Sequence, residues 1–357
     1  MKQVLLSVIK GVLKKAAVRK PVPQVNSLLM VRSKFLFLAV AIVGFSALAY
    51  AADDDFKLTL VDHPGQLSWT AEQFRVIQSS AKPGGKEIGI RGQDESGRLS
   101  FLGFLFLVPE DAPLTAAKCR DGALGPEKKS NPTLKILETS EIARTGSLPV
   151  SMVNYTAKGN DGKPVYMVRG FIATGDICGD LEFYSATPIS FADNDLKKIF
   201  ASYQLNEKYT PQFNDIFVYA EILYKAKMYA DAAPVFEKLM LEQKNISGPQ
   251  AKTMMRVVTD QAGMAYGISG NIAKARAIFE KAVAADPDYP MYYYNLACAD
   301  AEEKNLAGAK KHLQEAFDRK ANIIPGETMP DPTQDDSFLP YRNDKEFWMF
   351  VVGLSGK

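Results

Sequence analysis

The sequence predicts an α+β protein, with an antiparallel α/β sandwich domain over residues 53–205 and an all-α array of three helix pairs over residues 213–320. Three observations predict this fold. Short runs rich in β-branched and aromatic residues, separated by glycine turns, fill the first region. In the second region a pattern of large and small residues recurs at a spacing of 34 residues. Strands grouped apart from helices are typical of the α+β class.

The charge balance excludes one class of partner. The formal net charge is +2, but eight basic residues before Asp53 are unopposed, and the remainder holds 35 basic and 41 acidic residues. Nucleic-acid binding depends on clustered Lys and Arg side chains that displace counterions from phosphates. The acidic remainder therefore predicts no nucleic-acid partner.

Residues 30–52 have the order of a secretory signal peptide. Basic residues precede an unbroken apolar run that ends at Ala49, and small residues follow before an acidic stretch. Ala49 and Ala51 fit the small-x-small rule for cleavage. The run is shorter than the roughly 20 residues of a membrane-spanning helix. We therefore expect a periplasmic or extracellular protein, with an uncleaved inner-membrane anchor over residues 35–51 as the alternative.

Residues 1–29 form a basic leader with two interpretations. Apolar residues at helical spacing, opposite lysines, would suit a helix that lies on a membrane. Met30 directly precedes the signal segment, so it is also a candidate for the true start of the protein. In that case the leader would not be translated.

Along the first domain the elements are expected in a fixed order. Residues 67–79 are expected to form a helix, which the breaker at residues 83–85 ends. Two β-rich runs, joined by a turn at residues 95–97, indicate a hairpin. A second helix is expected at about residues 111–124 and a closing helix at about residues 192–203. Between these two helices, four further strands are expected at residues 133–143, 150–159, 164–175 and 178–187.

This order of elements is similar to the sandwich of the photosystem II extrinsic protein (PsbP-like) superfamily. The likeness lies in the architecture alone, since no motif accompanies it. It implies a fold for residues 53–205 and leaves their function open, because one fold hosts many functions.

The three cysteines suggest one disulfide and one spare thiol. Export would bring the chain to a compartment where disulfides persist. Cys119 follows a helical stretch and Cys178 opens a strand of the same domain, so we expect them to pair; two buried thiols that never meet are the alternative. Cys298 lies alone in the array and is expected to be a small core residue. The spacings match no zinc site, and no metal or other cofactor is expected.

The helical array has a register that can be followed from unit to unit. The second helix of the middle unit has small and large residues at Ala275, Phe279 and Ala282. The same pattern recurs 34 residues later at Ala309, Leu313 and Ala316, and 43 residues earlier at Ala232, Phe236 and Leu239. The nine extra residues of the longer interval fit a loop at residues 242–250. Small residues let helices approach and large ones fill the space between them. In this pattern the array resembles the tetratricopeptide repeat (TPR).

The C-terminal segment, residues 321–357, resembles the closure of a bacterial end-of-group TPR. The resemblance rests on a helix that reads Tyr-Asn-Leu-Ala-Cys at residues 294–298 and on a later acidic and aromatic pattern, at Asp335, Phe338, Arg342, Asp344 and Phe347. It implies a protein-interaction scaffold and brings no catalytic residues. A terminal repeat must cover its neighbour's apolar face, so this segment is expected to cap the array.

In TPR folds the first helix of each unit lines a concave groove that takes a peptide or a partner helix. The register assigns ten residues to that groove: Asn214, Phe217, Glu221 and Tyr224, then Asp260, Gln261 and Met264, then Tyr294, Asn295 and Cys298. Rings supply contact area and amides pair with a peptide backbone. The alternative is that Phe217 and Tyr294 pack against the first domain. The Lys and Asn set that grips a C-terminal carboxylate in some TPR proteins is missing apart from Asn295.

No catalytic constellation is visible in the sequence. His63 precedes a Pro-Gly turn, and His312 lies beside lysines on a helix, where it is expected to be solvated. No nucleophile elbow or phosphate-binding loop is present. We therefore expect an exported, non-catalytic scaffold that binds a peptide or a partner protein. The alternatives are a small-molecule or lipid sensor in the α+β domain, with the array as a docking module, and a hydrolase with an unrecognised site.

Overall fold

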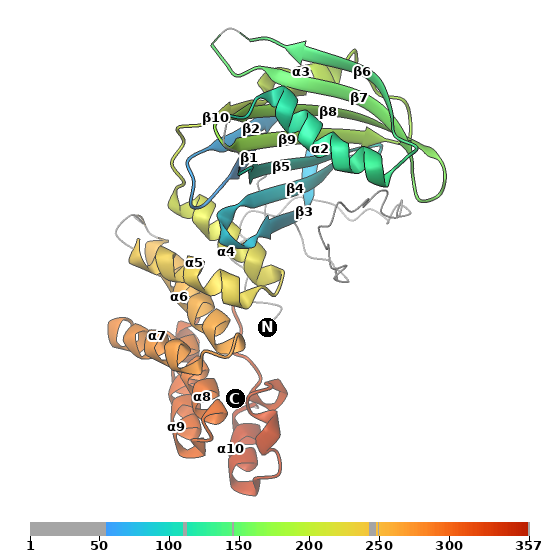
Figure 1. Ribbon diagram of the computed structural model, residues 1–357. Coiled ribbons are helices and arrows are strands. Elements are labelled where there is room, and N and C mark those ends of the chain that lie inside the picture. Colours follow the sequence, from blue (N-terminus) through green and yellow to red (C-terminus); the bar gives the residue numbers. More distant parts are fainter. Residues whose placement is uncertain (1–54, 110–112, 145, 243–247, 249, 356–357) are drawn as a thin grey trace. The chain divides into compact units, whose positions relative to one another are not determined.

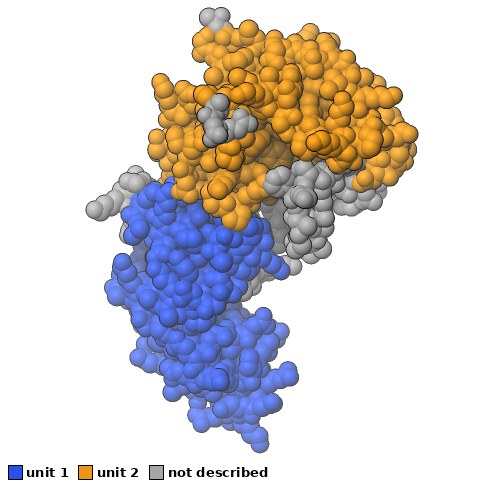
Figure 2. Space-filling view, viewed as in Figure 1, with its two compact units in different colours: residues 1–19, 216–357 blue, residues 20–215 orange. Residues whose placement is uncertain are grey.

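The computed structural model describes residues 55–109, 113–144, 146–242, 248 and 250–355. The described residues form two compact units, which divide between Asp215 and Ile216 (Figure 2). The expected leader and signal segment, with Ala49 and Ala51, lie outside the described residues. In the part of the chain that is described, no helix is both long and apolar enough to cross a bilayer.

The first unit is built around a seven-stranded antiparallel sheet (Figure 1). Its strands are β3 (Phe74–Lys82), β4 (Glu87–Asp94), β5 (Leu99–Leu107), β6 (Lys135–Ile142), β7 (Val150–Lys158), β8 (Pro164–Thr174) and β9 (Ile177–Ser185). Their order in the sheet is β3-β4-β5-β9-β8-β7-β6, so β3 and β6 are its two edges. The expected hairpin of β4 and β5 forms, and the four strands expected after it are β6 to β9.

Each face of the large sheet has its own cover (Figure 1). One face packs against a small sheet and a helix, namely β1 (Asp55–Thr59), β2 (Gln66–Thr70), β10 (Gln204–Asn206) and α3 (Asn194–Ser202). Helix α2 (Ala116–Ser130) packs on β7 and β8 at the other face. This antiparallel sandwich confirms the predicted α+β class.

Aromatic rings join the small sheet to the large one. Trp69 of β2 stacks on Phe56 of β1 and meets Phe101 of β5 edge-on, with ring centroids 5.5 and 5.6 Å away. A Cβ atom at Gly103 of β5 would lie 2.4 Å from the Trp69 ring. Glycine at this position therefore allows the two sheets to approach closely.

The helix expected at residues 67–79 is wrong. This stretch forms β2 and β3, joined by a turn in which Gln73 has a φ of 67°. In β2, Leu67 and Trp69 are buried while the residues between and beside them are half-buried, which is the period-two alternation of a strand. The apparent helical spacing arises because the window spans the turn between two strands.

The second helix begins and ends later than the expected 111–124. α2 starts after Thr115, whose hydroxyl caps the helix by accepting a backbone N–H, and it continues to Ser130. A disulfide joins Cys119 of α2 to Cys178 of β9, with their Cα atoms 6.1 Å apart. The expected pairing of these two cysteines is confirmed, and it ties the helix to the sheet that it covers.

The second unit is an array of antiparallel helix pairs. Its helices are α4 (Phe213–Lys225), α5 (Tyr229–Leu241), α6 (Ala251–Ile268), α7 (Ile272–Ala285), α8 (Pro290–Glu302) and α9 (Leu306–Asp318). Each helix from α5 to α9 packs on the next (Figure 1), and the rings of Phe217 and Phe236 join α4 to α5. Within the described residues, this succession of three stacked pairs confirms the predicted helical array.

Small residues set the helix spacing in the array, as the register predicts. A Cβ atom on Gly263 of α6 would lie 2.3 Å from the ring of Phe279 of α7. Gly267, about one turn further along α6, has ordinary room, since its Cβ would lie 3.6 Å from that of Ala275. The close approach is therefore confined to the level of the Phe279 ring.

The C-terminal segment packs against the third helix pair. It contains short 3-10 turns and then α10 (Lys345–Ser355). Phe338 and Phe347 are fully buried and share a cluster with Tyr294 and Leu313. The rings of Phe338 and Tyr294 meet edge-on, with centroids 6.0 Å apart. The apolar end of the third pair is thereby covered by the chain itself.

Candidate functional site

The ten residues assigned to the groove lie on α4, α6 and α8, the first helices of the three pairs, but their exposure differs. Asn214 is exposed. Five are half-buried, namely Phe217, Tyr224, Met264, Asn295 and Cys298. Four are buried, namely Glu221, Asp260, Gln261 and Tyr294. Only the exposed and half-buried members offer surface to a partner directly.

Side-chain contacts connect these residues from one first helix to the next. The Tyr224 hydroxyl of α4 lies 3.9 Å from the Met264 Sδ of α6. Asn295 Nδ2 of α8 donates a hydrogen bond to Asp260 Oδ1 of α6, at 2.6 Å. The structure therefore brings members of all three units into one connected set.

Two buried acceptors of this set lack hydrogen-bond donors. Both carboxylate oxygens of Glu221 and the Oε1 atom of Gln261 accept no hydrogen bond from the described residues. Glu221 is 1% exposed, and its charge is balanced only by the exposed Lys225, whose Nζ lies 3.2 Å from Oε2. An unsatisfied buried acceptor is unfavourable, so these atoms need an explanation beyond the packing of the array.

The second acidic group of the set, Asp260, is neutral near physiological pH. Burial raises the pKa of Asp260 to about 8, and the nearby carboxylate of Glu327 adds to the rise. Glu327 itself is buried and accepts a hydrogen bond from the Tyr289 hydroxyl, at 3.0 Å. Asp260 therefore adds hydrogen-bonding capacity to the first-helix residues rather than negative charge.

The C-terminal segment covers the third unit's share of the set. The Tyr294 hydroxyl donates to Asp335 Oδ2 at 3.1 Å, and Cys298 Sγ lies 4.0 Å from the same oxygen. Tyr294 is 2% exposed, so its ring faces Phe338 of the chain's own C-terminal segment. The residues left with accessible surface are concentrated on α4 and α6, together with Asn295.

The expected solvated position of His312 is wrong. Its Nδ1 atom lies 2.6 Å from Oδ2 of the buried Asp300, and its side chain is 21% exposed. Asp300 also accepts hydrogen bonds from Arg276 at 2.7 Å and from Asn305 at 3.2 Å. This network joins α7, α8 and α9, so the histidine serves the packing of the array.

A charged cluster that the sequence analysis missed lies between α2 and the large sheet. Arg169 of β8 donates two hydrogen bonds to Asp180 of β9, at 2.8 and 2.6 Å, and one to Glu127 of α2, at 2.8 Å. The Tyr155 hydroxyl lies 3.2 Å from a Glu127 oxygen and 3.3 Å from a Glu182 oxygen. One guanidinium is thus surrounded by three carboxyl groups.

Burial is the main influence on this cluster. It raises the pKa of Glu182 to about 8, so the carboxyl is largely protonated at pH 7. The side chains of Arg169 and Asp180 are 11% and 6% exposed, which makes the cluster a packed ion network rather than an open acid–base site. A sequence signal existed, because Asp180 and Glu182 stand two apart on one face of an otherwise apolar strand.

Among the described residues, no group of three His, Cys, Asp or Glu side chains is placed to hold a metal ion. His63 Nε2 lies 3.1 Å from Asp176 Oδ1 in the sheet unit, with both side chains partly exposed. The arrangement of polar groups described above is suited to binding through hydrogen bonds and charge.

No family model and no curated protein matches the sequence. Solved structures with partial likeness include PcrH from Pseudomonas aeruginosa, 13% identical over 40% of this chain and 91% of that one, with a TM-score of 0.28. The type III secretion translocator chaperone SycD of Yersinia enterocolitica is 17% identical over 42% of this chain and 96% of its own, with a TM-score of 0.28. The Sgt2 TPR domain from Aspergillus fumigatus is 17% identical over 42% and 85%, with a TM-score of 0.27. Likeness at these TM-scores carries no argument about this chain.

Proposed function

We propose that the chain is an exported, non-catalytic scaffold that binds a polypeptide partner on the face formed by α4, α6 and α8. The observation that carries this proposal is the pair of buried acceptors, Glu221 and Gln261. Among the described residues, Glu221 Oε1 and Gln261 Oε1 have no donor, and Glu221 Oε2 has only its ion pair with Lys225. Leaving such a group unsatisfied costs about 1–3 kcal/mol. Because Glu221 and Gln261 are 1% and 8% exposed, a partner supplies donors to them where neighbouring side chains move aside as it binds.

The missing groups define the chemistry of the partner. Carboxylate and amide oxygens accept hydrogen bonds from backbone N–H groups and from Lys and Arg side chains. The buried carboxylate of Glu221 favours a segment that carries a basic residue. The half-buried Tyr224 and Met264 offer apolar contact area beside these acceptors. We therefore expect a segment in which Lys or Arg stands next to apolar residues.

A random dodecapeptide library displayed on phage tests the proposal. Selection on the immobilised full chain should enrich peptides with a Lys or Arg beside an apolar residue. An enriched peptide should bind the double variant Glu221→Gln, Asp260→Asn about tenfold more weakly, which is a loss of about 1.4 kcal/mol. Gln and Asn keep the shape of the side chains, so the loss would report on the carboxyl groups themselves.

The matched control is Glu280→Gln on α7, a second helix, where the carboxylate is 60% exposed and paired with Arg276. This variant should bind the peptide as the wild type does. The proposal would be contradicted if the selected peptides were not enriched in Lys or Arg, or if a selected peptide bound the double variant and the wild type with equal affinity.

A further inference from the structure

The edge strand β6 of the sheet unit is exposed along its whole length. All eight residues are exposed, and no described strand pairs with its outer side. Ile136, Leu137 and Ile142 expose 45%, 56% and 36% of their surface. A free edge presents unpaired N–H and C=O groups, and native proteins usually blunt or cover it. β6 carries charged residues and a register shift between Ile136 and Glu138, but its exposed apolar side chains make it a candidate for pairing with another strand.

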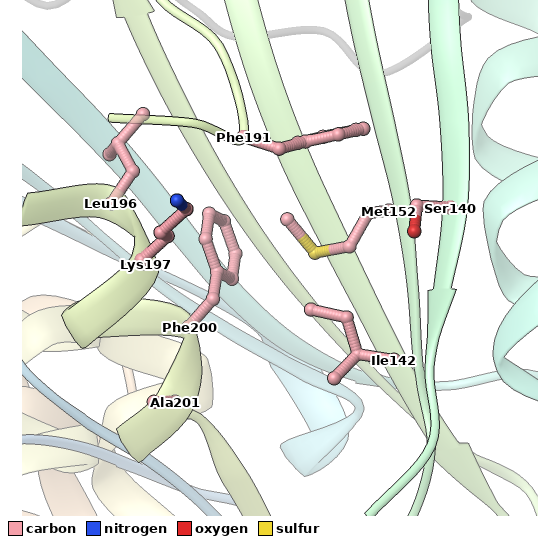
Figure 3. A pocket seen from close by; sticks show the side chains of 8 residues that line it. All are labelled: Ser140, Ile142, Met152, Phe191, Leu196, Lys197, Phe200 and Ala201. Carbon is pink, nitrogen blue, oxygen red and sulfur yellow. The ribbon is translucent and has the colours of Figure 1, made fainter. Parts of the chain in front are cut away.

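An apolar cavity lies beside this edge, between the large sheet and α3 (Figure 3). Its wall is formed by Ile142 of β6, Met152 of β7, Phe191 of the loop before α3, and Leu196 and Phe200 of α3 itself. Figure 3 shows the side chains of Met152, Phe191 and Phe200 converging on the same space. The cavity and the exposed edge therefore form one surface, since β6 contributes to both.

The volume of the cavity indicates what kind of group it can hold. Its volume is about 200 Å³. Sites for small molecules typically have volumes of about 300–1,000 Å³. A dry apolar cavity of about 150 Å³ is known to hold benzene. The cavity thus suits one apolar side chain better than a lipid chain or a larger ligand.

The register of the sheet aims an added strand at the cavity. Ser140 of β6 lies opposite Met152 of β7, and both line the cavity. Residues opposite one another in neighbouring strands point to the same face. A strand paired with the outer side of β6 would therefore place every second side chain on the cavity's side of the sheet.

Charge adds a second element of specificity. Lys197 of α3 lines the cavity, is exposed, and has no ion-pair partner among the described residues. A carboxylate on the added strand, near the buried apolar side chain, would complement it. Main-chain hydrogen bonds supply affinity in such strand addition, and pockets for alternate side chains supply selectivity.

We propose that β6 is a docking edge for an extended segment of another protein. The segment adds a strand to the large sheet, inserts one apolar side chain into the cavity and sets a carboxylate near Lys197. This interaction involves the sheet unit alone, so it goes beyond the partner proposed for the helical array and does not depend on it.

A synthetic probe tests the proposal on the full chain. The probe is a fluorescent octapeptide of alternating Thr and Val with one central Leu and an Asp two residues after it. We expect saturable binding by fluorescence anisotropy. Methylation of alternate backbone nitrogens of the probe should weaken binding about tenfold or more, because it removes main-chain donors while leaving the side chains in place.

Two variants complete the test. Ala201→Phe, at an exposed position that lines the cavity, should fill the space and weaken binding to a similar degree. Ile77→Lys, at an exposed apolar position of the opposite edge strand β3, should leave binding unchanged. Binding that tolerates backbone methylation would identify a side-chain pocket only and overturn the proposal. The proposal would also be overturned if the probe did not bind, the chain formed a dimer, and Leu137→Lys dissociated that dimer. In that case β6 would pair with a second copy of the chain.

Discussion

Two deeply buried carboxyl groups, Asp180 of the sheet unit and Glu221 of the array, are held in opposite ways, although the sheet unit also contains buried polar atoms without partners in the described part of the chain, such as Trp69 Nε1 and Asn154 Oδ1. In the sheet unit, Arg169 is hydrogen-bonded to Asp180 and Glu127, so buried charges are paired within the fold. In the array, Glu221 and Gln261 are as deeply buried but have acceptor oxygens without donors among the described residues. Paired buried charges make a core more rigid, whereas unsatisfied buried acceptors lower its stability.

The difference is not a general property of the helical unit. Asp300 of α8 is also buried, and it is fully engaged by Arg276, Asn305 and His312. Among the described residues, the sheet unit has unsatisfied groups on Trp69, Arg91, Asp94, Asn154 and Tyr203, while those of the array lie on α4 and α6, the first helices of the first two pairs. Their position suggests a role in binding rather than a flaw in packing, and substitutions can separate the two.

The largest expected effect follows from removing the cation of the sheet cluster. Arg169→Met leaves the buried Asp180 and the half-buried Glu127 and Glu182 without their partner, and it should lower the free energy of unfolding by about 3–5 kcal/mol. In a Trp348→Phe background, Trp69 is the remaining tryptophan and reports denaturant unfolding of the sheet unit. The exposed Arg75→Met serves as the control and should change stability little. A loss below about 1 kcal/mol in Arg169→Met would mean that the pairing is incidental.

The disulfide should give the next largest effect, again confined to the sheet unit. It closes a loop with a sequence separation of 59 residues. Reduction should destabilise the unit by about 2–4 kcal/mol, because the unfolded chain regains conformational freedom. A Cys119→Ser, Cys178→Ser variant should show the same loss without reductant and no further response to it. If reductant left the thermal unfolding midpoint of the wild type unchanged, a stabilising effect of the disulfide would be excluded.

The array also depends on the close approach of α6 and α7. Gly263→Ala places a methyl group against the Phe279 ring and should cost about 1–3 kcal/mol through overpacking. Gly267→Ala has room for its methyl group and should be neutral or stabilising by up to about 1 kcal/mol, since alanine favours helices. Thermal unfolding followed by far-UV circular dichroism compares the pair. Equal effects would show that Gly263 is not a packing constraint.

A smaller effect concerns the pH dependence of the sheet unit. The pKa of Glu182 is about 8 in the folded state and about 4.3 in an unfolded chain. Between these values the folded state holds a proton that the unfolded chain has released, so stability falls as pH rises through this window. Between pH 5 and pH 9, the Glu182→Gln variant should lose less unfolding free energy than the wild type, by on the order of 1 kcal/mol. The exposed Glu138→Gln should leave the slope unchanged, and an unaltered slope in Glu182→Gln would exclude Glu182 as its source.

Regular patterns allowed most of the fold to be predicted from the sequence. The strands from β4 to β9 follow local alternation and glycine turns, and the array follows a repeat in which Phe279 and its counterparts keep register. The helix expected at residues 67–79 failed because Trp69 and Phe74 belong to two different strands, β2 and β3, joined by a turn at Gln73. That turn contains no glycine or proline, so the sequence gives little sign of the break.

The candidate site was predictable only in part. The register places its residues on first helices, since it depends on spacing alone. It gives no information about the path of the C-terminal segment, which buries Tyr294 against Phe338. Nor does it reveal which buried acceptors remain unsatisfied, because donors such as Asn295 come from another repeat.

The most direct test of the contrast between the units measures stability and affinity on one protein, the Glu221→Gln, Asp260→Asn variant. Because Glu221 is buried beside the partly exposed Lys225 and Asp260 is largely neutral already, neutral isosteres should leave the unfolding free energy of the array within about 0.5 kcal/mol of the wild type, or raise it. Calorimetric titration with a selected basic peptide should at the same time show affinity about tenfold weaker. A clear loss of stability with unchanged affinity would instead make these residues part of the array's own packing, and would contradict the account.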